Sequence, residues 1–236
     1  MPNILTSERF AWLDALRGIA VVLMVIFHFC YDLSYFGWLE ADVSGPSAWM
    51  PFRYLIVTTF VLTMGCSLYL AYHRAMRWKH FAHRQLKLLG FALLISLSST
   101  LMYPNAWVYF GILHFMLAAG FICLPFIRFW WAALPCAAII FAISWIQILP
   151  FNWPFNYIDS WLPSARTIDF VPPIPWLAPA LLGVCLGHLV VNTRFSGLQT
   201  INPAYWLVFL GRKSLIIYLL HQPVLFLLLY PLSFVI

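Results

Sequence analysis

The stretch 13–38 is long and apolar enough to cross a lipid bilayer, yet it contains Asp14, Arg17, His28 and Asp32. On a helix with about 100° between successive residues, all four project from one narrow stripe. At about 1.5 Å per residue, Asp14 and Asp32 are about 27 Å apart along the axis, close to the hydrocarbon thickness of a bilayer. Because ionisable groups inside a span are costly and usually face a bundle interior or a wet cavity, this stripe is a candidate functional site.

The composition excludes a soluble globular domain. Hydrophobic residues make up 64% of the chain, charged residues only 8%, and the mean hydropathy is +0.89, which is far from the average of soluble domains. The formal charge of +6 does not indicate nucleic acid as a partner, because no polar surface accompanies the basic residues. We expect an integral membrane protein in contact with membrane lipid. The five cysteines lie in apolar segments without metal-ligand spacing, so we expect no metal site.

Seven apolar segments have the length of membrane spans. They cover about 13–38, 53–72, 88–102, 107–126, 130–149, 176–191 and 214–234, and a shorter apolar stretch at 205–210 precedes the last one. No polar block is long enough to fold by itself. The sequence therefore predicts an all-α fold, a polytopic bundle of about seven transmembrane helices that forms a single domain over residues 1–236.

The distribution of basic residues predicts the orientation of this bundle. If the N-terminus is cytoplasmic, eleven of the 13 lysines and arginines fall on the inner side, and only Arg53 and Arg166 fall on the outer side. Connections on the cytoplasmic side are enriched in lysine and arginine. We therefore predict a cytoplasmic N-terminus.

Three histidines, His28, His114 and His221, are predicted to lie inside spans and to reach a common depth. One histidine in a span can have a structural role with a single hydrogen bond, but three at one depth indicate a site. Asp32 lies one turn from His28 and would orient or acidify it, as in the base–orienter pairs of acyl transfer. Metal binding is the alternative, although no paired-ligand spacing supports it.

The run 73–87 is the only dense basic segment. It is typical of a cytoplasmic loop that sets topology, and beside an internal polar site it would also bind the phosphate groups of a cytosolic donor. Residues 211–214, Gly-Arg-Lys-Ser, begin a predicted helix on the same side, where backbone N–H groups favour an anion. Asp14 and Arg17 alternatively form only an ion pair at the membrane surface.

Five blocks in chain order resemble one family of membrane enzymes: LDALRGIAVVLMVIFHFCYDL, FVLTMGCSLYLAYHR, FGILHFMLAAG, DFVPPIPWLAPALLGVCLG and LGRKSLIIYLLHQPVL. They are similar to bacterial members of the heparan-alpha-glucosaminide N-acetyltransferase catalytic-domain family, within the transmembrane acyltransferase superfamily. The resemblance spans nearly the whole chain. It implies a multi-pass enzyme of the bacterial inner (cytoplasmic) membrane that uses acetyl-CoA from the cytosol. The acetyl group would pass to an amino or hydroxyl group, typically of a saccharide, on the outer side.

The resemblance also suggests residue roles. The lysosomal member has an asparagine in place of His28, and its catalytic histidine lies in the outer connection, whose counterpart here, 37–47, has no histidine. We therefore assign the role of general base to His28 or His114, with Asp32 as orienter and His28 as a potential transient acyl carrier. The residues expected at the donor phosphates are Arg17, Arg74, Arg77, Arg84, Arg212, Lys213 and Ser214, and those expected at the acceptor are His221, Asp169, Trp176 and Tyr103.

Two other functions use the same features. A small-solute transporter or permease would use the intramembrane histidines as a proton relay, although the chain lacks an internal repeat. A structural component of a cell-envelope complex would need none of the histidines. The oligomeric state stays open, with a homo-oligomer among the alternatives.

Overall fold

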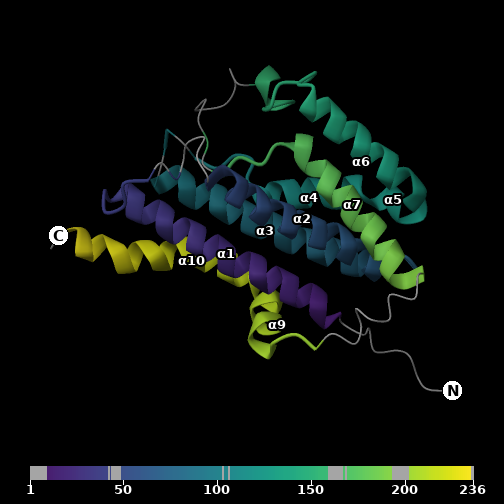
Figure 1. Cartoon of the computed structure of the whole chain (residues 1–236), viewed down its shortest axis with the longest axis horizontal. Coiled ribbons are helices and arrows are strands. Elements are labelled where there is room, and N and C mark those ends of the chain that lie inside the picture. Colours follow the sequence, from purple (N-terminus) through teal and green to yellow (C-terminus); the bar gives the residue numbers. More distant parts are fainter. Residues whose placement is uncertain are drawn as a thin grey trace. The chain divides into compact units, whose positions relative to one another are not determined.

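The computed structural model describes residues 10–41, 43, 49–102, 104–105, 107–158, 167, 169–192 and 202–234. Within these residues the chain is helical and contains no β-strand, which confirms the predicted all-α class. The chain falls into two compact units, residues 1–60 together with 193–236, and residues 61–192. Figure 1 shows the helices of both units.

The helices coincide with the apolar segments of the sequence. They are α1 (Ala11–Tyr35), α2 (Trp49–Tyr72), α3 (Trp78–Met102), α4 (Ile112–Ile122), α5 (Leu124–Arg128), α6 (Trp130–Trp145), η1 (Phe155–Tyr157), α7 (Pro173–Asn192), α9 (Tyr205–Arg212), α10 (Ser214–Leu229) and η3 (Tyr230–Phe234). The first unit contains α1, the start of α2, α9, α10 and η3, and the second unit contains the other helices.

Four helical segments of the described part are long and apolar enough to cross a membrane. They are α1, α2, α7 and the continuous segment Ser214–Phe234, while α4 and α6 are shorter apolar helices. The chain is thus an all-helical membrane protein. The count of seven spans and the cytoplasmic N-terminus stay predictions.

Two predicted boundaries differ from the structure. Residues 107–111 are not helical, because α4 begins only after Gly111, whose backbone is extended at φ −87° and ψ −173°. The prediction of a loop over 73–87 is wrong from Trp78 onward, where α3 has already begun. In α3, Phe81, Gln85 and Leu88 are buried at helical spacing, so the buried face extends into the basic run.

In the first unit, α1 packs against α9 and α10 (Figure 1). The ring of His28 meets that of His221, and further along both helices the ring of Tyr35 lies 5.9 Å from that of Phe226. Residue numbers therefore rise in the same direction on both helices. It follows that α1 and α10 are parallel.

In the second unit, α7 packs closely on α2. A Cβ atom at Gly183 would collide with the carbonyl oxygen of Leu62, and one at Gly65 with the carbonyl oxygen of Ala180. These small residues let two backbones approach, as is common between membrane helices. The neighbouring pair α3 and α4 is antiparallel, because Phe81 meets Phe121 near one end and Ser96 meets His114 near the other.

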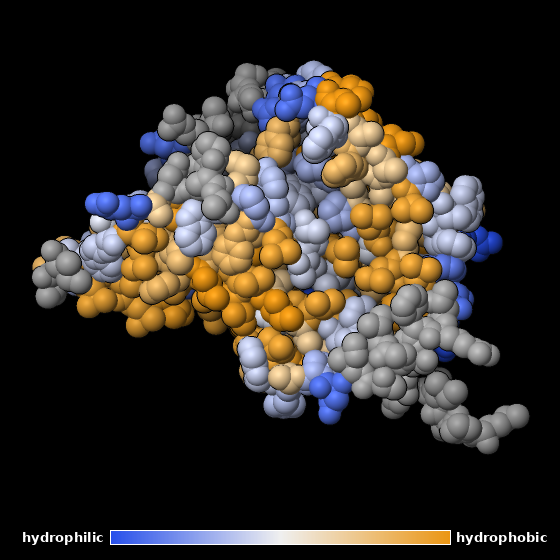
Figure 2. Space-filling model, in the orientation of Figure 1, coloured by the Kyte–Doolittle hydropathy of each residue, from blue (hydrophilic) through white to orange (hydrophobic). Residues whose placement is uncertain are grey.

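Large apolar side chains cover the outside of several helices. On α10, Leu227 is 75% exposed and Leu228 is 62% exposed, and Figure 2 shows a hydrophobic surface over this helix. On α6, Leu134 and Phe141 are similarly exposed. In water such surfaces would be unfavourable, so they are consistent with contact to lipid.

Replacing Gly183 with alanine should lower the thermal unfolding temperature of the detergent-purified protein. The added methyl group meets the backbone of Leu62 and lies 2.9 Å from the amide nitrogen of Cys66, and overpacking of this kind costs about 1–3 kcal/mol. The matched control is Gly90→Ala on α3, where the added methyl group meets nothing within 4 Å. There, alanine should gain up to about 1 kcal/mol of helix propensity. Equal shifts for both variants would contradict the close packing of α2 and α7.

Candidate functional site

His28 of α1 and His221 of α10 lie against each other within the first unit. Their ring centroids are 4.6 Å apart and the ring planes are inclined by 77°, so the edge of one ring meets the face of the other. The parallel packing of α1 and α10 places the two residues at the same level. The structure thus brings together two of the three predicted histidines.

Main-chain carbonyl groups fix the tautomer of both rings. Nδ1 of His28 lies 2.9 Å from the carbonyl oxygen of Met24, and Nδ1 of His221 lies 2.7 Å from that of Tyr218. A carbonyl oxygen only accepts hydrogen bonds, so each Nδ1 carries a hydrogen and, in the neutral ring, each Nε2 carries the lone pair. Nε2 of His221 is buried and has no hydrogen-bond partner. The pair therefore presents basic nitrogens.

Asp32 is completely buried beside this pair, with an exposed fraction of 0%. Its Oδ1 accepts a hydrogen bond of 2.8 Å from Nε2 of Gln222, the residue that follows His221 on α10. Nδ1 of His28 lies against the carbonyl oxygen of Met24, and the role of Asp32 as orienter of His28 stays a prediction. The side chain that holds the Asp32 carboxylate is therefore Gln222, which the sequence analysis did not single out.

We refer to His28, Asp32, His221 and Gln222 as the histidine–carboxylate cluster. Three of its buried atoms have no hydrogen-bond partner among the described residues, namely Oδ2 of Asp32, Nε2 of His221 and Oε1 of Gln222. All three are acceptors when the imidazole is neutral and the acid ionised. Since buried polar atoms are rarely left unpaired, the cluster is suited to a ligand that donates hydrogen bonds.

His114 lies in the second unit, and both of its ring nitrogens have protein partners. The N–H of Gly111 donates to Nδ1 at 3.3 Å, so Nε2 carries the hydrogen in the neutral ring and lies 3.2 Å from the hydroxyl of Ser96. The Ser96 hydroxyl in turn donates to the carbonyl oxygen of Val108 at 2.7 Å. His114 thus braces the start of α4 against α3, which indicates a positioning role. A catalytic role for His114 stays a prediction.

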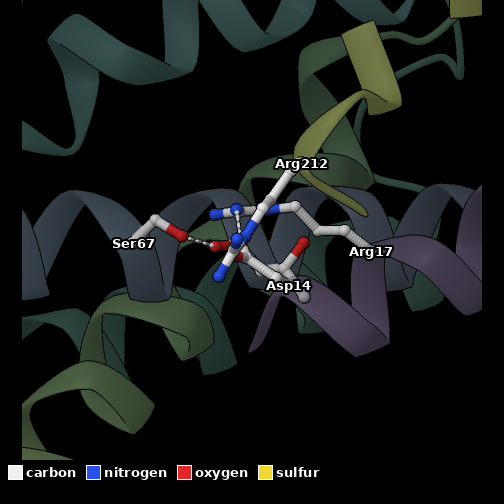
Figure 3. Close-up of polar contacts among 5 residues, drawn as sticks. Asp14, Arg17, Ser67 and Arg212 are labelled. Atoms are coloured by element: carbon white, nitrogen blue, oxygen red, sulfur yellow. Dashed lines mark hydrogen bonds and ion pairs between the residues drawn. The ribbon is translucent and has the colours of Figure 1, made fainter. Parts of the chain in front are cut away.

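Asp14, Arg17 and Arg212 form an ion-pair cluster within the first unit, and Figure 3 shows both guanidinium groups near the carboxylate. Nη1 of Arg17 lies 2.9 Å from Oδ1 of Asp14, and Nε of Arg212 lies 3.4 Å from Oδ2. Gly211 packs on the carbonyl oxygen of Asp14, which holds α9 close to α1. Two cations share one carboxylate, and the Arg212 side chain is 43% exposed. The cluster therefore has an excess positive charge that suits an anion.

The other residues predicted at the donor phosphates lie in both units. Lys213 is exposed and directly precedes Ser214, the first residue of α10. Gly211 and Arg212 instead end α9, so the predicted helix start is confirmed for Ser214 alone. In the second unit, Arg74 and Arg77 are exposed between α2 and α3, and Arg84 is partly buried on α3.

A tyrosine–histidine pair accompanies these arginines in the second unit. The hydroxyl of Tyr72 lies 2.9 Å from Nδ1 of His80. Partial burial and the nearby charges of Arg77, Arg84 and His83 lower the pKa of His80 below its ordinary value of 6.5. His80 is therefore mainly neutral at pH 7 and would gain a proton beside a bound anion.

The residues predicted at the acceptor are distributed over both units, and their role stays a prediction. His221 belongs to the histidine–carboxylate cluster of the first unit. In the second unit, Asp169 adopts a left-handed backbone at φ 56° beside Gly111, and Trp176 is buried in the first turn of α7. Tyr103 lies outside the described residues. Within the described ranges, no three His, Cys, Asp or Glu side chains could hold a metal ion together.

The long apolar helices and the buried ionisable cluster define an integral membrane protein with an internal polar site. Residues 9–223, most of the chain, match the family model described as heparan-alpha-glucosaminide N-acetyltransferase, catalytic. The chain belongs to this family, and its function is therefore membrane acetyltransferase-like. Neither the curated proteins nor the solved structures contain a match to the chain.

Replacing Gln222 with leucine should destabilise the protein, because the buried Asp32 carboxylate loses the hydrogen bond that this amide donates. An unsatisfied buried acceptor costs about 1–3 kcal/mol, and more when it is charged. Adding Asp32→Asn to this variant should recover part of the loss, since a neutral amide is cheaper to bury than a carboxylate. Thermal unfolding of the two single variants and the double variant gives the coupling energy. Strictly additive shifts would show that Gln222 does not hold Asp32.

Proposed function

We propose that this protein transfers an acetyl group from cytosolic acetyl-CoA to an amino or hydroxyl group, belonging to a saccharide, on the outer side of the bacterial inner membrane. Membership of the acetyltransferase family supports the reaction type. The observation that carries the proposal is the histidine–carboxylate cluster, because its three unpartnered atoms are all acceptors. An amine or a hydroxyl group donates the hydrogen bonds that these atoms lack.

The chain's own contribution to the chemistry is proton transfer and orientation. The acceptor must lose a proton when it is acetylated, and Nε2 of the His28–His221 pair takes it up as a general base. Since the rings are in contact, one proton on the pair disfavours a second. Asp32, held by Gln222, stabilises the protonated imidazole and keeps the acceptor in place. His28 is the first candidate for the base, and a transient acyl group on the same nitrogen is the alternative to direct transfer.

Acetyl-CoA would supply the acetyl group in activated form, as a thioester. The residues that fit its phosphates are cationic and at least partly exposed: Arg17, Arg212 and Lys213 with Ser214 in the first unit, and Arg74, Arg77 and Arg84 in the second. The excess charge of the Asp14–Arg17–Arg212 cluster supports this assignment. Asp169, Trp176 and Tyr103 are proposed to contact the acceptor.

The alternative function, transport of a small solute, would use the same histidines as a proton relay. Membership of the family favours acetyl transfer instead. Measuring solute flux in vesicles without an acyl donor separates the two functions. Flux that requires the histidines but no donor would favour transport.

Purified protein should transfer label from labelled acetyl-CoA to an amino sugar, and His28→Asn should lower turnover by at least a hundredfold, the typical contribution of a general base. His221→Asn should also lower turnover, because the cluster loses the acceptor atom Nε2 of the imidazole. Tyr205→Phe on α9, at a side chain that is 80% exposed, is the control with normal turnover. Absence of donor binding and of label transfer, or full activity in both His28 and His221 variants, would refute the proposal.

The same assay separates the two roles considered for His114. If His114 braces α4, its replacement by asparagine should lower the thermal stability of the protein, and turnover should be restored on cooling. If His114 is the general base, the same replacement should lower turnover without changing the unfolding temperature.

The affinity for coenzyme A should increase as the pH falls, and this increase should depend on His80. Nearby Arg77 and Arg84, together with burial, lower the pKa of His80 in the free protein, and a bound phosphate should raise it. Binding then takes up a proton. The affinity therefore increases as the pH falls through the raised pKa of the complex, and it stops increasing below the lowered pKa of the free protein. The phosphate itself titrates near 6 in every variant. The measured quantity is therefore the ratio of affinities for wild type and His80→Gln, and a ratio independent of pH would contradict phosphate binding at His80.

A further inference from the structure

Helix α3 has two opposite faces of different character. Phe81, Gln85, Leu88 and Ala92 are buried and face the interior of the second unit. At about 100° per residue, the opposite face carries Leu86, Gly90, Leu93, Leu97 and Leu101, and these four leucines are all more than half exposed. The apolar section from Gly90 to Leu101 is about 16 Å long, which is close to the depth of one leaflet of a bilayer.

Basic residues lie directly above this apolar stripe on the same face. Lys79, His83 and Lys87 follow one another at intervals of four residues, and all three are exposed. Lys79 and His83 lie on the same face as the leucines, and Lys87 lies at its edge, about 60° from the partly buried Arg84. Long basic side chains at the end of an apolar helical stripe reach the headgroup region of a membrane.

Gly90 lies where the basic and apolar parts of this face meet, and we call the space that its absent side chain leaves open the notch. A Cβ atom built on Gly90 meets nothing within 4 Å, whereas Gly65, Gly120 and Gly183 are needed for close contacts inside the second unit. Glycine inside a helix costs about 1 kcal/mol relative to alanine, and no contact of the described chain explains it at position 90. The notch is open to a neighbour from outside the chain.

We propose that this face of α3 binds an anionic phospholipid. The headgroup phosphate lies among Lys79, His83 and Lys87, and one acyl chain enters the notch at Gly90 and follows the leucines toward Leu101. Positive charge above an apolar stripe of one leaflet's depth matches the headgroup and chain of such a lipid in both charge and length. Helix α6 is the contrasting surface, because it is equally apolar outside but contains no lysine or arginine.

The test reconstitutes the full chain in vesicles of phosphatidylcholine with a minor fraction of phosphatidylglycerol. The photoreactive residue p-benzoylphenylalanine replaces Leu93 on α3 or Leu134 on α6, two leucines that are each 58% exposed. Mass spectrometry identifies the cross-linked lipid. Phosphatidylglycerol should be enriched at position 93 above its share in the vesicle, and at position 134 the lipids should be cross-linked in vesicle proportion.

The charge and the notch can be tested separately. Lys79→Gln with Lys87→Gln should lower the enrichment at position 93 by up to about thirtyfold, since each basic residue near an anionic headgroup contributes roughly a factor of five. Lys79→Arg with Lys87→Arg should retain it. Gly90→Leu, which fills open space and should not disturb folding, should lower cross-linking to either lipid at position 93.

Three outcomes would overturn the proposal. They are equal enrichment at positions 93 and 134, enrichment that persists in the double glutamine variant, and cross-linking of position 93 to a second copy of the chain. The readout does not depend on acetyl transfer, so it is independent of the proposed function.

Discussion

The burial of the Asp32 carboxylate between α1 and α10 is the constraint on which the first unit depends. An ionised carboxylate has room for about four hydrogen bonds, and Gln222 supplies one to Oδ1 while Oδ2 has none. Such burial costs several kcal/mol when it is incompletely compensated. Apolar side chains alone would let α10 slide along α1, whereas His221 and Gln222 must both meet their partners on α1, His28 and Asp32. The polar contacts therefore fix the register of the two helices.

The directions of the packed helices agree with a chain that crosses a membrane alternately. Within the first unit α1 and α10 are parallel, as the first and last of an odd number of spans must be. Within the second unit α2 and α7 are parallel, because Gly183 meets Leu62 and Gly187, further along α7, meets Tyr69. Helices α3 and α4 are antiparallel, and both directions match the predicted order of crossings. Trp130 at the start of α6 stacks on His188 near the end of α7 at 3.5 Å, so this pair is antiparallel. These directions are consistent with seven spans, whose number stays a prediction.

Hydropathy predicted the positions of the helices because each apolar segment must form its backbone hydrogen bonds internally. It did not predict the partner of Asp32, because the pairing of α1 with α10 depends on contacts between residues almost 200 positions apart. The sequence does mark Gln222 as a candidate, since an amide beside His221 in an apolar span needs a hydrogen-bond partner. The helical part of the basic run was not predicted, because its high density of charge indicated a loop. The helical spacing of Phe81, Gln85 and Leu88, which are buried in the structure, indicates the helix.

The start of a helix decides which ring nitrogen carries the hydrogen in these histidines. His28 and His221 lie inside their helices, so Nδ1 donates to a carbonyl of the preceding turn and the basic Nε2 is turned away from the helix's own backbone. His114 is the third residue of α4, where the free N–H of Gly111 occupies Nδ1 and leaves Nε2 as a donor. The hydropathy pattern placed the start of this segment at 107, five residues before Ile112, and so placed His114 deep in a span. A shift of little more than one turn in the helix start thus changes which nitrogen of the same residue type carries the hydrogen.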